Sequence, residues 1–279
     1  MRELTRELIS NFKVYLIEEE KSKATLEKYI RDIETFYARV GNNEVDKLCV
    51  LNYKKYLTDN YAVSSVNSML SSLNSFFAYL EWFELRIKTI KVQKQIFASN
   101  EKELTKREYG RLLTAAKAKK NLRLYLLMQT ICSTGIRVSE LRFITVESIN
   151  RGRAEINCKG KRRCAFLPTE LCKILKNYAK EQKIKSGAVF VSKNGNPLDR
   201  SNIWSEMKKL CKEAGVSEKK VFPHNLRHLF ARTYYTIQKD IVRLADILGH
   251  SSVNTTRIYT METGEIHRKQ IQRLGLLRC

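Results

Sequence analysis

The sequence is poor in several features that define other classes of protein. It has three prolines and eleven glycines in 279 residues, which argues against a collagen-like or disordered chain. No run approaches the roughly 18 apolar residues that a membrane span needs, and the N-terminus lacks the apolar stretch of a secretion signal. The seven cysteines form no C-x-x-C pair, and their number is odd. These absences predict a globular, cytoplasmic protein with reduced thiols and no membrane association.

Basic residues are in excess and are unevenly distributed. The net charge of +23 comes from 52 Lys and Arg against 29 Asp and Glu. Residues 1–100 contain 15 basic and 13 acidic residues, so 37 basic and 16 acidic residues lie in 101–279. An excess of this size favours a polyanionic partner, and nucleic acid is the first expectation. A soluble protein covered by solvated lysines is the alternative, because charge alone names no chemistry.

The pattern of apolar residues predicts two mainly helical domains. Up to about residue 90, apolar positions recur at three and four, as on one helix face, and they fit four short helices. Segment 153–168 is instead typical of two short strands around a Lys-Gly-Lys turn. The other helices of this part are expected at 106–119, where Thr105 can cap the start, at 121–134, from about 138, and at 200–213, 224–237, 240–248 and 253–260. We therefore expect a mainly α (α+β) fold. Its parts are a four-helix domain at 1–92, a linker at 93–103, a second helical domain with a small antiparallel sheet at 104–263, and a tail at 264–279.

Arginine and histidine residues occur in patterns that suit chemistry at a phosphodiester. Without a metal, such a reaction needs guanidinium groups on the non-bridging oxygens and a proton donor for the leaving 5′ oxygen. Arg137 follows a glycine at a predicted helix start, where Glu140 could orient it. His224 and Arg227 share one face of a helix that begins at Pro223. Together these residues could bind a phosphate and exchange a proton with it.

A third group of residues offers a nucleophile. His250 follows Gly249 at a turn, and Tyr259 lies nine residues later on a polar helix. Tyr259 is one of thirteen tyrosines, so a structural aromatic with its hydroxyl satisfied is the alternative. A metal site is the rival for the histidines, because His224 and His228 are four residues apart. No glutamate lies between them and the neighbouring charges are basic, so we expect no metal.

In order and spacing these motifs resemble those of Xer-like tyrosine recombinases, over nearly the whole chain. The matching motifs are Gly-x-Arg-x-x-Glu-Leu at 135–141, a lysine in a β-turn at 159, His-x-x-Arg-His-x-Phe-Ala at 224–231, Leu-Gly-His at 248–250 and Thr-Thr-x-x-Tyr at 255–259. The resemblance implies an N-terminal SAM-like core-binding domain and a phage-integrase-type catalytic domain that clamp duplex DNA. Helix 66–80 resembles the family's DNA-facing helix, but it lacks basic residues, so we expect a weak grip there.

The resemblance also implies roles for individual residues. Those expected at the scissile phosphate are Arg137, Lys159, His224, Arg227, His250 and Tyr259. Tyr259 would form a 3′-phosphotyrosyl bond while Lys159 protonates the leaving 5′ oxygen, so strand exchange would need no metal, cofactor or ATP. Related proteins commonly have Gly-Lys-Gly where this chain has Cys-Lys-Gly-Lys, so Lys161 is a second candidate for the proton donor. The residues expected on DNA phosphates are Lys161, Arg162 and Arg163.

The expected partner is double-stranded DNA with inverted-repeat half-sites. The leucine-rich tail could fold back onto its own core in a monomer. By resemblance, it would instead dock into a neighbouring subunit of a homotetramer on synapsed DNA, with or without a partner recombinase, whereas the chain off DNA would be a monomer or dimer. Two other functions are open at this point. One is a type IB topoisomerase, and the other is a DNA-binding protein that has the fold without the catalysis.

Overall fold

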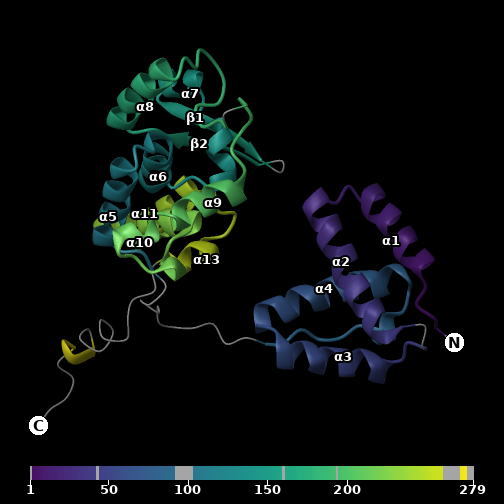
Figure 1. Cartoon of the computed structure of the whole chain (residues 1–279). Coiled ribbons are helices and arrows are strands. Elements are labelled where there is room, and N and C mark those ends of the chain that lie inside the picture. Colours follow the sequence, from purple (N-terminus) through teal and green to yellow (C-terminus); the bar gives the residue numbers. More distant parts are fainter. Residues whose placement is uncertain are drawn as a thin grey trace, which may run out of the picture. The chain divides into compact units, whose positions relative to one another are not determined.

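The computed structural model describes residues 2–41, 44–91, 103–158, 161–192, 194–259 and 271–274 (Figure 1). The chain divides into two compact units, Met1–Lys94 and Gln95–Cys279, which we call unit 1 and unit 2. Across these described ranges, no helix combines the length and the apolar character that a bilayer crossing requires.

Helices are the main elements of the described part of unit 1. Its elements are α1 (Arg6–Glu18), α2 (Lys23–Val40), α3 (Lys47–Asn60), α4 (Val63–Tyr79) and the 3-10 turn η1 (Phe83–Leu85). The first three helices begin where a side chain accepts a backbone N–H of the first turn; these caps are Thr5, Ser22 and Asp46. The apolar faces meet in a core that includes four fully buried phenylalanines: Phe12, Phe36, Phe76 and Phe77. The prediction of four helices is confirmed.

Two asparagines of α4 bind the segment that follows it. Asn74 exchanges hydrogen bonds with the backbone of Ile87, at 2.8 and 2.9 Å. Asn67, two turns earlier, does the same with Ile90, at 2.9 and 2.7 Å. The side-chain amide of each supplies both a donor and an acceptor, so it can pair with a residue's N–H and C=O together. These polar groups of α4 are therefore satisfied inside unit 1.

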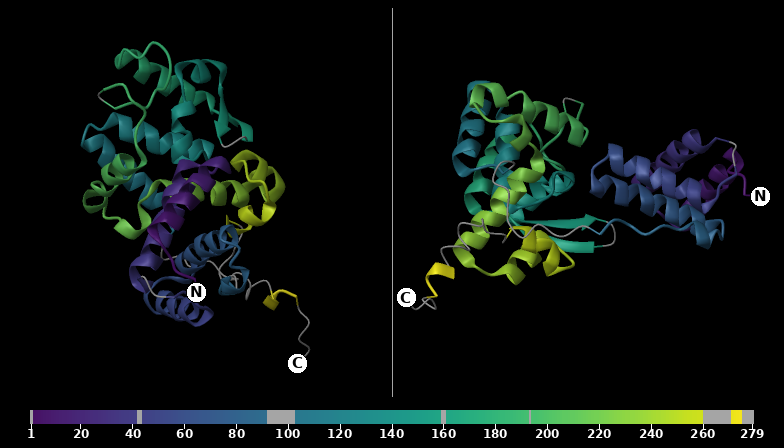
Figure 2. Two further views of the ribbon diagram at one scale, coloured as in Figure 1. Left: turned by 90° about the vertical axis from the view of Figure 1, so that its right-hand side faces the viewer. Right: turned by 90° about the horizontal axis from the view of Figure 1, so that it is seen from below.

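Unit 2 consists of helices around one small sheet. The elements before the sheet are α5 (Lys106–Ala118), α6 (Leu122–Thr134), the 3-10 helix η3 (Val138–Phe143) and α7 (Val146–Arg151). Strands β1 (Arg153–Cys158) and β2 (Lys161–Phe166) pair antiparallel and project as a hairpin (Figure 2). The elements after it are α8 (Thr169–Glu181), α9 (Arg200–Lys208), α10 (Cys211–Ala214), η4 (Glu218–Lys220), α11 (Pro223–Gln238), α12 (Ile241–Leu248), α13 (Val253–Thr256) and η5 (Arg257–Tyr259). The mainly helical fold with a small antiparallel sheet agrees with the sequence prediction.

A glycine allows the two central helices of unit 2 to approach each other. Gly135 ends α6 in the left-handed region, with φ at 66°. A Cβ atom there would lie 2.4 Å from Cδ1 of Phe230 on α11. Any side chain would therefore push α11 away, and only glycine adopts this φ without strain. The close contact also brings the Gly135 carbonyl to the residues of α11 that are described below.

Three helical segments differ from the predictions. The helix expected from about 138 is a six-residue 3-10 helix, preceding the separate short helix α7. The helix expected at 200–213 is divided into α9 and α10, whose Cys211 and Ala214 turn into the core. The one expected at 253–260 is a single α-turn followed by a 3-10 turn. Short 3-10 segments have little periodicity of their own, so the apolar spacing could not separate them from α-helix.

Candidate active site

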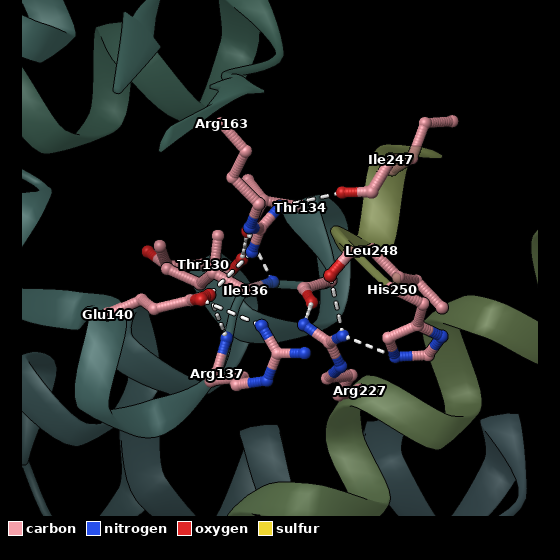
Figure 3. A network of polar contacts seen from close by, with 11 residues as sticks. Thr130, Thr134, Ile136, Arg137, Glu140, Arg163, Arg227, Ile247, Leu248 and His250 are labelled. Atoms are coloured by element: carbon pink, nitrogen blue, oxygen red, sulfur yellow. Dashed lines mark hydrogen bonds and ion pairs between the residues drawn. The ribbon is translucent and has the colours of Figure 1, made fainter. Parts of the chain in front are cut away.

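Glu140 lies at the centre of an ion-pair network with two arginines (Figure 3). Its Oε1 accepts from Nη1 of Arg137 at 2.9 Å, and its Oε2 accepts the Arg137 backbone N–H at 2.7 Å. Oε2 also accepts from Nη2 of Arg163 at 2.5 Å. The 3-10 winding of η3 places residues three apart in line, which brings Glu140 back to Arg137. The predicted orientation of Arg137 by Glu140 thus has a direct geometric basis.

The charge of Glu140 is maintained although its side chain is only 3 % exposed. Burial alone would raise the pKa of this carboxyl. The hydrogen bond from Arg163, the one from the Arg137 backbone and the positive charge of Arg163 outweigh burial, and they hold the pKa below its usual value. The side chain of Arg137 is 42 % exposed, so it can still reach a ligand while Glu140 holds it.

Arg163 crosses from the hairpin to the end of α12. Its Nη1 donates to the carbonyl of Ile247 at 2.6 Å, while Nη2 is bound to Glu140. The side chain passes directly over Gly249, where a Cβ atom would lie 2.2 Å from Cδ of Arg163. Gly249 also has φ at 64°, so two independent constraints favour glycine here. Arg163 thereby links η3, β2 and α12.

Arg227 is 1 % exposed, the largest fully buried side chain in the described part of the chain. Its Nη1 donates to the carbonyl of Gly135 at 2.7 Å, and its Nη2 donates to that of Leu248 at 2.8 Å. Burial and the nearby Arg137 lower the pKa of Arg227 to about 10, whereas Tyr259 counteracts them. The guanidinium is therefore still charged at neutral pH. Two main-chain carbonyls at helix ends fix its position.

His250 is bound through both ring nitrogens. Its Nε2 lies 2.9 Å from Nη2 of Arg227, and its Nδ1 lies 2.9 Å from Oγ1 of Thr256. Burial, followed by the charges of Arg227 and Arg137, lowers the pKa of His250 to about 4. The imidazole is therefore neutral at pH 7.

His224, His228 and Tyr259 form a row of rings. The ring of His228 packs edge-on against the ring of His224, with 4.6 Å between the ring centroids, and edge-on against the ring of Tyr259, with 4.7 Å between the centroids. The ring of Tyr259 also stacks on that of His250, with 6.1 Å between the ring centroids. Tyr259 is 4 % exposed. Burial and the neighbouring charge of His224 lower the pKa of His228 to about 4. The pKa of His224 is lowered too, by desolvation and by Arg227 and Arg137.

A surface pocket of about 880 Å³ opens beside these groups. Arg137, Arg162 and His250 line it, together with Gly249 and Ser251. Arg142, Arg163 and the carboxylate of Glu140 also line it, so four guanidinium groups face one carboxylate. This excess of positive charge suits an anion, because arginine donors match phosphate oxygens in pairs. A phosphodiester held there would lie next to the predicted catalytic groups.

The structure brings together five of the six residues predicted at the phosphate: Arg137, His224, Arg227, His250 and Tyr259. Lys159 lies outside the described residues, and so does the side chain of Lys161. Of the basic residues predicted on DNA, the two whose side chains are described, Arg162 and Arg163, differ in environment. Arg162 is exposed, but Arg163 is 12 % exposed and both of its terminal nitrogens are bound within unit 2. The run of charge in the sequence could not distinguish these two environments.

Two residues of the site were missed as functional in the sequence. His228 drew attention only as a possible metal ligand, yet its ring lies between His224 and Tyr259. Thr256 was noted only as part of the Thr-Thr-x-x-Tyr motif, and it is fully buried against His250. Over the described ranges, no group of three or more His, Cys, Asp or Glu side chains could hold a metal ion.

Comparisons with known proteins show which family the chain resembles. Residues 102–265 match the phage integrase family, and residues 9–84 match the phage integrase N-terminal SAM-like domain. Tyrosine recombinase XerA of Pyrococcus furiosus is 30% identical over 288 residues, which cover 99% of this chain and 98% of that protein. A crystal structure of a lambda integrase (75-356) dimer bound to a COC' core site has a TM-score of 0.77 at 18% identity, covering 94% of this chain and 97% of that one. A lambda integrase tetramer bound to a Holliday junction has a TM-score of 0.71 at 18% identity, covering 91% and 76%.

The family matches define the class of protein, and the lambda integrase structures have the same fold as this chain. The chain belongs to the phage integrase family and is a tyrosine site-specific DNA recombinase related to the Xer proteins.

Proposed function

We propose that the chain cleaves and rejoins double-stranded DNA through a covalent bond between Tyr259 and a 3′ phosphate. The observation that supports this most strongly is the convergence of Arg137, Arg227 and His250 with Tyr259 in unit 2. These groups come from four separate elements, and each arginine is held by protein acceptors before any ligand binds. Such preorganised donors stabilise charge that develops in a transition state.

The proposed reaction assigns one task to each group. Tyr259 attacks the phosphorus, its hydroxyl proton passes to His224 by way of the His228 ring that lies between them, and the bond to the 5′ oxygen breaks as that oxygen takes a proton from Lys159 or Lys161. Arg137 and Arg227 bind the non-bridging oxygens. Attack by a 5′ hydroxyl of a partner strand then reverses the steps and releases Tyr259. The phosphodiester energy is retained in the covalent bond, so the scheme needs no ATP and no metal.

The two units would divide the work as the sequence predicted. We assign residues 1–92 to core DNA binding, 104–263 to catalysis, and 264–279 to docking on a neighbouring subunit. The related lambda integrase structures, a dimer on a core site and a tetramer on a Holliday junction, support double-stranded DNA as the partner and a tetramer as the working assembly. Of the tail, only 271–274 is described, and Ile271 and Leu274 are exposed there. We also propose that the protein acts in the cytoplasm, since the proposed partner is double-stranded DNA.

A nicked duplex tests this proposal. The purified chain is incubated in EDTA with nicked DNA that contains the inverted repeats flanking its gene, and SDS-resistant complexes are measured. We expect an adduct with the wild type and none with Tyr259→Phe. Bound DNA without any adduct would indicate the catalytically silent binder, and relaxation of a plasmid that lacks the repeats would indicate a topoisomerase.

A further inference from the structure

The hydrogen bonds of His250 determine which of its ring nitrogens carries the proton. A guanidinium has only N–H donors, so Nη2 of Arg227 must donate to Nε2 of His250. Nε2 is therefore the unprotonated nitrogen. The ring is neutral because its pKa is about 4, so it carries one proton, and that proton is on Nδ1. The Nδ1–H then donates to Oγ1 of Thr256 at 2.9 Å.

Thr256 is well placed to maintain this tautomer. It has no solvent exposure, so water does not replace its hydroxyl. It lies in α13, three residues before Tyr259, so the partner of His250 and the proposed nucleophile belong to one short segment. The charged and titratable groups around His250 are Arg227, Arg137, Arg163 and His224, and the ring of Tyr259 stacks on it. None of the three arginines can accept the Nδ1–H, because guanidinium groups only donate.

We propose that Thr256 is a positioning residue of the active site: it fixes the Nδ1–H tautomer of His250, so that the Nε2 lone pair holds the guanidinium of Arg227 in place. The functional part of this inference rests on the proposed recombinase chemistry, whereas the tautomer does not. In the other tautomer, with the proton on Nε2, the imidazole would present an N–H to the N–H of Arg227. Two opposed donors repel each other, so Arg227 would lose its hydrogen bond to the ring, and only the carbonyls of Gly135 and Leu248 would hold the guanidinium.

Loss of the Thr256 hydroxyl should therefore act through His250. Thr256→Val has nearly the same shape but leaves a buried Nδ1–H without an acceptor. The hydrogen bond from Arg227 still favours a bare Nε2, so the two tautomers come closer in free energy and a fraction of the molecules carries the proton on Nε2, with one proton on the ring throughout. Thr256→Ser keeps the hydroxyl and should restore the wild-type tautomer. Thr130→Val is the matched control, because Thr130 is equally buried and its hydroxyl donates to the carbonyl of Leu126.

The tautomer can be measured directly in the full-length protein without DNA. Histidine labelled with nitrogen-15 gives long-range proton–nitrogen spectra that distinguish a protonated from an unprotonated ring nitrogen, and His250→Asn assigns the signals. At pH 7 we expect protonated Nδ1 at His250 in the wild type, Thr256→Ser and Thr130→Val. In Thr256→Val we expect a measurable fraction of His250 with protonated Nε2. A wild-type ring with Nε2–H, or an unchanged Nδ1–H in Thr256→Val, would overturn the inference.

The functional consequence is tested by single-turnover cleavage of nicked DNA at saturating concentration. Loss of a buried hydrogen bond to the ring predicts cleavage about tenfold slower in Thr256→Val, with DNA affinity unchanged within about threefold, and a normal rate in Thr256→Ser. A purely structural role would lower the melting temperature of Thr256→Val and Thr130→Val alike and leave the cleavage rate of folded protein unchanged, which contradicts the proposal. Absence of cleavage in the wild type would refute the proposed function but leave the spectroscopic result intact.

Discussion

Replacement of Gly249 by alanine should destabilise unit 2 mainly through Arg163. A Cβ atom would meet Cδ of Arg163 at 2.2 Å and Nε at 2.8 Å. This side chain cannot simply move aside, because Glu140 and the Ile247 carbonyl bind its end. The left-handed φ of 64° adds a strain of about 1 kcal/mol for a non-glycine residue.

The contribution of the ion pair can be estimated from its burial. Breaking a buried pair by removing one partner costs about 3–5 kcal/mol. Arg137 remains on Glu140 after Arg163 is displaced, so we expect about half, roughly 2 kcal/mol. Gly249→Ala should then lower the free energy of unfolding by about 3 kcal/mol in total.

A double-mutant cycle separates the two contributions. Arg163→Ala removes the atoms that the new Cβ would contact, so in that background Gly249→Ala should cost only the strain, about 1 kcal/mol. Urea unfolding of the full chain is measured in a Trp82→Phe background, where the remaining tryptophan, Trp204, reports on unit 2. If Gly249→Ala costs the same in both backgrounds, the contact with Arg163 is not the reason for the glycine.

Three further predictions concern stability. Glu140→Gln should lower the free energy of unfolding by about 3 kcal/mol or more, because two guanidinium groups lose their carboxylate, and urea unfolding measures it. The pKa values of His228 and His250 are about 4, below 6.5, so the unfolded chain binds more protons between these values. The stability that the two neutral histidines contribute should therefore be fully present above about pH 6.5 and decrease towards pH 4, by less than about 1.4 kcal/mol per pH unit for each histidine. In urea titrations at several pH values, His228→Phe should reduce this slope. Thr105→Ala removes the capping box at the start of α5 and should cost about 1 kcal/mol, measured by the same urea titration.

The sequence predicted the helices well where apolar spacing and caps agree. Thr105 was expected to start a helix, and it forms the cap of α5. The position of the Arg163 side chain could not be predicted in this way, because the sequence of a basic strand does not distinguish an arginine that faces inward from one that faces DNA. Its position depends on Glu140, 23 residues earlier, and on a carbonyl 84 residues later, which only the tertiary fold brings together.

The same limit applies to the candidate site. The residue types and their order pointed to Arg137, His224, Arg227, His250 and Tyr259, because few other groups can act on a phosphodiester. Which nitrogen of each histidine is free, and which arginine is held by which carbonyl, depends on contacts between distant segments. Those contacts carry the information on tautomers and charge that the linear order lacks.

The central claim is tested most directly by identifying the covalent bond itself. The SDS-resistant complex is digested with trypsin and nucleases, and the modified peptide is sequenced by mass spectrometry. The proposed chemistry predicts a nucleotide joined through its 3′ phosphate to Tyr259, in the peptide of residues 258–268. A nucleotide on another residue, or one joined through a 5′ phosphate, would contradict it.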